Sequence, residues 1–74
     1  MKEVDYMEKR IVACIIERGK YKNTVHVTYD DKSEEDIFTY YPDELSFSET
    51  ELIGLTGPQA RELHYRKDIT YIHN

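Results

Sequence analysis

Histidine and cysteine are the side chains of this 74-residue chain best suited to acid–base or metal chemistry. The histidines stand at positions 26, 64 and 73, and the single cysteine is Cys14. None of them has the close pairwise spacing of a zinc site. Cys14 lies within an apolar run, where cysteine behaves as a small buried hydrophobe. His64 and Asp68 are spaced to pair on a helix, but no nucleophile accompanies them. We therefore expect no metal, no cofactor and no enzymatic activity.

The negative charge of the chain is concentrated in its middle. The formal net charge is −5. Residues 30–51 carry nine acidic residues and one lysine, whereas residues 1–29 carry six basic and four acidic residues, and residues 52–74 carry three and two. Such an uneven distribution bears on the choice of partner more than on the fold. We therefore expect a partner with a basic surface.

Seven tyrosines accompany these charges. Tyrosine buries apolar area while keeping a polar tip, which suits interfaces, and an aromatic ring beside carboxylates attracts cationic groups. The alternative is that the rings complete a small core with their hydroxyls in water. We predict a protein-binding surface made of Tyr29, Asp30, Asp31, Glu34, Glu35, Tyr40, Tyr41 and Glu44. A phage-encoded inhibitor or adaptor would fit such a surface.

A second hypothesis, from a different functional class, rests on the only cluster of cations beside an aromatic residue. The segment contains Arg18, Lys20, Tyr21 and Lys22. Its cations can hold phosphates while the tyrosine stacks on a base, as in proteins that bind single-stranded nucleic acid. The acidic middle segment would repel a polyanion, so the alternative is an ordinary solvated hairpin.

Composition places the chain among small globular proteins. Charged residues make up 34% and apolar residues 39% of the sequence, which is not the composition of a disordered chain. The length predicts a single small domain over residues 1–74. One cysteine fits a reducing compartment, and the N-terminal segment has no apolar stretch. We expect a cytoplasmic protein that does not bind membranes.

Three segments have the patterns of strands. Residues 10–18 form the most apolar run, and their β-branched residues favour a strand, although helical spacing is also present. Residues 21–29 alternate between apolar and polar side chains after a turn at Gly19. Residues 30–35 predict a solvated turn, and residues 36–41 a third strand that Pro42 ends.

The register of the first hairpin depends on its loop length. The two alternating sets of the first strand are Val12, Cys14 and Ile16, and Ile11, Ala13 and Ile15. A two-residue loop would place the first set on the same face as Val25 and Val27, and a three-residue loop would place the second set there. An open sheet edge would also permit a homo-oligomer.

Two helix starts follow the strands. Ser48 and Glu51 form a capping box, with Phe47 and Leu52 spaced as a hydrophobic staple, and predict a short helical turn over 49–53 that ends at Gly54. A second box predicts a helix over residues 57–67, with Pro58 near its start.

The second helix start lies at Thr56 and Gln59, and the apolar face of its helix is thin, mainly Ala60 and Leu63. Residues 69–72 consist of good strand formers and predict a closing strand, with an extension of the helix as the alternative.

Together these elements predict an α+β fold, in which an antiparallel meander of three or four strands is covered by a C-terminal helix. Residues 10–45 resemble the middle of a Tudor- or KOW-type SH3-like barrel, although the chain has no tryptophan. That resemblance implies, as the alternative fold, a barrel with a helical insertion that binds peptides or nucleic acid. The second half is similar to small uncharacterised proteins of bacteria and phages, which implies no activity.

Overall fold

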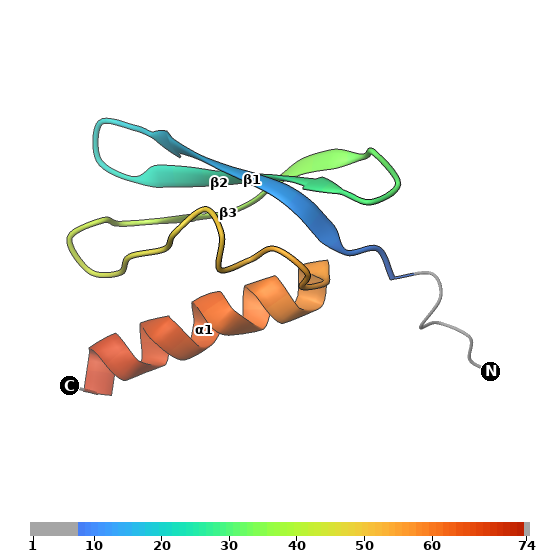
Figure 1. Cartoon of the computed structure of the whole chain (residues 1–74). Coiled ribbons are helices and arrows are strands. Elements are labelled where there is room, and N and C mark those ends of the chain that lie inside the picture. Colours follow the sequence, from blue (N-terminus) through green and yellow to red (C-terminus); the bar gives the residue numbers. More distant parts are fainter. Residues whose placement is uncertain (1–7, 74) are drawn as a thin grey trace.

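The fold is α+β, as predicted, with one antiparallel sheet and one helix (Figure 1). The computed structural model describes residues 8–73. Its strands follow one another across the sheet in the order β1-β2-β3. The sheet is open, so the alternative of a closed barrel is wrong. The elements are β1 (Ile11–Arg18), β2 (Asn23–Tyr29), β3 (Glu34–Tyr40) and α1 (Gly57–His73).

The first hairpin combines features of both predicted registers. Its loop, 19–22, has four residues, and this even number places Cys14 opposite Val27 and Ile16 opposite Val25, as a two-residue loop would. A β-bulge between Ile11 and Ala13 then shifts the register, so that Ile11 also lies in the core and Val12 is exposed.

The second hairpin is tighter than the sequence predicted. β3 begins at Glu34, because the chain reverses within residues 30–33, where Lys32 adopts a left-handed φ of 74°. A second β-bulge, in β3 opposite Val25 and His26, adds one extra residue, and both Ile37 and Phe38 pack toward the core.

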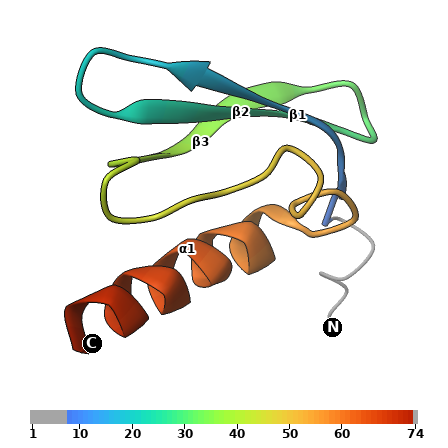
Figure 2. The ribbon, with the colours of Figure 1, turned by 60° about the vertical axis from the view of Figure 1, so that its left-hand side comes forward.

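The segment 41–56, which joins β3 to α1, supplies much of the cover over the sheet (Figure 2). It reverses after Pro42 in a turn in which the amides of Glu44 and Leu45 donate to the Tyr41 carbonyl. Its apolar residues Leu45, Phe47 and Leu52 are buried among the side chains of the sheet. The segment therefore covers part of the apolar face of the sheet, in addition to the part that the helix covers.

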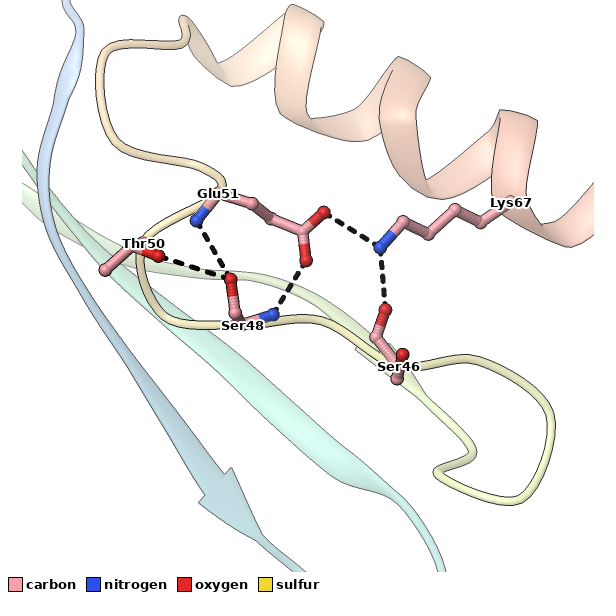
Figure 3. Close-up of polar contacts among 5 residues, drawn as sticks. All are labelled: Ser46, Ser48, Thr50, Glu51 and Lys67. Atoms are coloured by element: carbon pink, nitrogen blue, oxygen red, sulfur yellow. Dashed lines mark hydrogen bonds and ion pairs between the residues drawn. The ribbon is translucent and has the colours of Figure 1, made fainter.

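The first predicted capping box is confirmed and holds this segment in place (Figure 3). The Ser48 amide donates to the Glu51 carboxylate over 2.7 Å, and the Glu51 amide donates to the Ser48 hydroxyl over 3.2 Å. Lys67 of α1 donates to the same carboxylate at 2.9 Å and to the Ser46 carbonyl at 2.6 Å. Gly54 ends the turn with the predicted left-handed φ, 89°.

The helix begins as predicted but continues to His73. Its capping box pairs the Thr56 amide with the Gln59 side chain at 2.9 Å and the Gln59 amide with the Thr56 hydroxyl at 3.3 Å. The predicted strand over 69–72 is wrong, and the helical extension is right. A helix satisfies its own backbone amides and carbonyls, so residues 69–73 need no sheet edge to pair with. Among residues 8–73, no helix combines the length and apolarity needed to cross a membrane.

We predict that Leu52→Ala lowers the free energy of unfolding by about 2–5 kcal/mol, because Leu52 is fully buried and its removal leaves a cavity. The neighbouring Ile53 is 43% exposed, so Ile53→Ala should change stability by about 1 kcal/mol or less. Urea unfolding followed by circular dichroism measures both. Equal losses from the two variants would contradict the role given to the 41–56 segment.

Candidate protein-binding surface

Residues 8–73 cover one face of the sheet and leave the other face uncovered. The helix and the 41–56 segment both lie on one side of it (Figures 1 and 2). Strand alternation and the two registers direct ten side chains to the other side. This open face consists of Val12, Ala13, Ile15 and Glu17 from β1, Thr24, His26 and Thr28 from β2, and Glu34, Asp36 and Thr39 from β3.

The open face is apolar along one side and acidic along the other. On β1, Val12 is 54% and Ile15 56% exposed, which is unusual for two large aliphatic residues on one short strand. The acidic residues are Glu34 and Asp36 on β3, with Glu17 near the end of β1. No lysine or arginine is among the ten residues. The face therefore offers apolar contact and negative charge together.

His26 lies between the two sides of the open face. Its Nδ1 lies 2.8 Å from an Asp36 oxygen, and its Nε2 lies 2.8 Å from a Glu34 oxygen. A carboxylate only accepts, so both bonds form when the ring is protonated and both nitrogens donate. The bonds with Asp36 and then Glu34 raise the pKa of His26. With both nitrogens occupied, the three residues do not form a metal site, and none is found in residues 8–73.

The acidic hairpin at 30–36 brings together four of the predicted binding residues, Asp30, Asp31, Glu34 and Glu35. Three of them have partners, among them Glu34, which bonds to His26 as described above. Asp31 accepts from the amide and hydroxyl of Ser33, bonds that hold the pKa of its carboxyl below the usual range, and Lys9 lies 3.6 Å away. Glu35 forms an ion pair with Arg61 of α1.

The predicted residues Tyr41 and Glu44 lie elsewhere. Both follow β3, so the whole strand separates them from the acidic hairpin (Figure 1). Tyr41 is half exposed, as expected for one ring of the Tyr40–Tyr41 pair. Glu44 lines a groove of about 430 Å³ with Leu45, Lys67 and Tyr71 among its walls. The structure thus divides the predicted surface into two sites.

Two of the predicted binding residues, Tyr29 and Tyr40, have rings that are buried in the core and are not exposed at a surface. Tyr29 alternates in phase with the valines of β2, and Tyr40 alternates in phase with the inward residues of β3. Both side chains therefore point to the covered face of the sheet. Burial, and then the charge of Glu35, raises the pKa of Tyr29. The cation over its ring is the chain's own Lys9, 4.8 Å from the centroid.

The cationic hairpin is brought together as predicted. Arg18, Lys20, Tyr21 and Lys22 are all exposed, and the Lys20 ammonium lies 5.5 Å from the Tyr21 ring centroid. None of these cations has an ion pair within residues 8–73. The hairpin lies at the opposite end of β2 from the acidic hairpin, so the two charge clusters are separated by the length of that strand.

Sequence reasoning did not single out His26, Asp36 or the exposed side of β1. The sequence does indicate the face on which His26 lies, since alternation in residues 21–29 directs it to the side opposite Val25 and Val27. A reversal within residues 30–33 then places Asp36 opposite it. The exposure of Val12 could not be found in this way, because it follows from a bulge.

No family model matches the chain, and no curated protein or solved structure matches it either. The resemblances to SH3-like modules and to small phage proteins therefore stay predictions. The surfaces described above are the basis for any statement about function.

We predict that His26 titrates above the ordinary histidine value of about 6.5. Because the pKa of His26 is higher in the folded than in the unfolded state, protonation of the ring stabilises the fold. This stabilisation is complete at pH values below the pKa of the unfolded chain, and it is lost as the pH rises through the pKa of the folded state. Ring-proton NMR measures the titration, and Asp36→Asn should shift it toward the ordinary value. Asp43→Asn, far along the chain from this cluster, is the control. A wild-type pKa at or below the ordinary value would contradict the described geometry.

Proposed function

We propose that the protein is a non-enzymatic binding module that holds a basic surface of a partner protein against the open face of its sheet. The observation that carries the proposal is the open face itself, with exposed aliphatic residues beside carboxylates and no lysine or arginine among its ten side chains. Apolar contact contributes affinity, while opposite charge speeds association and selects the partner.

This proposal moves the expected contact from a tyrosine-rich surface to the strands. Glu34 from the sequence prediction is retained, and Asp36, Ile15 and Val12 are added. Asp30, next to the face at the tip of the hairpin, has no ion pair within residues 8–73 and extends the same negative field. An inhibitor or adaptor is the kind of protein that needs only such a surface.

We predict that the triple variant Ile15→Ser, Glu34→Gln, Asp36→Asn loses the partner. The partner would be sought by affinity capture from nuclease-treated lysate of the source organism, with captured proteins quantified by mass spectrometry. The expected result is one or more basic proteins that the wild type retains at moderate salt and the variant does not.

The matched control is Asp43→Asn with Glu44→Gln, which removes two charges from the turn after β3 and leaves the open face intact. Circular dichroism must show that both variants remain folded. Equal capture by the triple variant and the wild type would overturn the proposal.

The cationic hairpin supports a second candidate, binding of single-stranded nucleic acid, because its three cations are exposed and distant from the acidic hairpin. Under this hypothesis Lys20→Glu with Lys22→Glu abolishes binding of a fluorescent single-stranded oligonucleotide, measured by polarisation. Each phosphate contact that the wild type makes should contribute about 0.7 unit to the slope of log affinity against log salt concentration. Lys32→Glu in the other hairpin is the control. Unchanged binding would eliminate this candidate.

A further inference from the structure

The two outer edges of the sheet differ in whether their backbone amides and carbonyls are hydrogen-bonded. The outer edge of β1 is occupied, because the Ile11 amide donates to the Leu55 carbonyl and the Gly54 amide donates to the Ile11 carbonyl, both at 2.8 Å. Further along, the Ile16 amide donates to the Glu49 carboxylate at 2.9 Å. No segment of residues 8–73 makes corresponding backbone bonds to the outer edge of β3. Within the described part of the chain, this second edge is therefore the one left for pairing.

The groups at that edge follow from the hairpin geometry. Tyr29 exchanges backbone bonds with the turn, donating to Ser33 at 2.8 Å and accepting from Lys32 at 2.9 Å. Bonded and non-bonded pairs alternate in an antiparallel ladder, so Glu35 bonds to β2. The amides and carbonyls of Glu34 and Asp36 therefore point away from β2, toward the free edge. Unpaired groups of this kind form a template for another strand.

The side chains at this edge determine which strand can pair there. Glu34 and Asp36 both lie on the open face. A second copy that paired through the same edge would bring these carboxylates against each other, which is unfavourable. A strand with lysine or arginine at every second position would instead place cations beside them. His26 occupies one oxygen of each carboxylate, and the second oxygen of each remains for the incoming cation.

We propose that an extended basic segment of the partner protein adds to the sheet as a fourth, antiparallel strand at the free edge of β3, with alternate cations on Glu34 and Asp36. The inference rests on the proposed function and specifies how the partner binds. The bulge that follows Asp36 interrupts the regular edge, so the paired stretch is short. Pairing is antiparallel, as between the other strands, because directly opposed residues then exchange both backbone bonds.

The test uses the full chain and a capped peptide in which four lysines alternate with three valines. In the proposed pairing, the lysines lie opposite Glu34 and Asp36, and their amides face β3, while the valine amides face solvent. One peptide is N-methylated at its lysines and another at its valines. The two methylated peptides have the same composition and charge, so they differ only in which edge of the peptide can donate backbone hydrogen bonds.

The expected result is that the unmodified and valine-methylated peptides bind, while lysine methylation weakens binding by about tenfold or more, since several hydrogen bonds are lost together. Amide exchange at Glu34 and Asp36 should slow when the unmodified peptide is bound. Equal binding of both methylated peptides would overturn strand addition and leave charge-driven docking on the open face intact. Failure of all three peptides to bind would also overturn strand addition, whereas the capture experiment above decides the proposed function separately.

Discussion

The structure depends on the attachment of the 41–56 segment between the sheet and the helix. A sheet of three strands must bury one apolar face, and α1 contributes little more than Ala60 and Leu63 to this burial. The attachment centres on Lys67, which donates to two groups of the segment and lies 4.0 Å above the ring of Phe47. Burial raises the pKa of the Glu51 carboxyl, but the Lys67 and Ser48 bonds outweigh it, so this pKa is lowered. The carboxylate thus stays charged, and one set of bonds holds the helix to the 41–56 segment.

The same arrangement explains why the other face of the sheet is open. Residues 8–73 contain a single helix, and that helix shares one face of the sheet with the joining segment. Outward positions of β2 are therefore polar, with threonines on either side of His26, as is typical of an antiparallel sheet with one wet face. β1 departs from this pattern at Val12 and Ile15. The departure distinguishes the proposed binding face from an ordinary solvated surface.

The elements were largely predictable because their causes are local. Alternation identified β2, and the Thr56 cap identified the start of α1, since a cap depends only on residues three apart. The Ser48 capping box also forms, but residues 49–54 make turns and not the predicted helical turn. Features that depend on the partner strand were not predictable, among them both bulges and the exposure of Val12. The prediction of surface residues was the least accurate part, because composition identifies tyrosines and acids but not the side of the sheet on which each lies. Tyr29 and Tyr40 illustrate this limit.

The bonds between the start of β1 and residues 54–56 have a consequence for the order of folding. Arg10 donates to the Gly54 carbonyl across 44 positions of sequence, whereas each hairpin closes over a short turn. Closing a longer loop loses more chain entropy, so we expect the hairpins to form early and the 41–56 segment to dock late. Until it docks, both edges of the sheet and its apolar underside are exposed to water. The acidic side chains of β3 then repel neighbouring chains during the most aggregation-prone stage of folding.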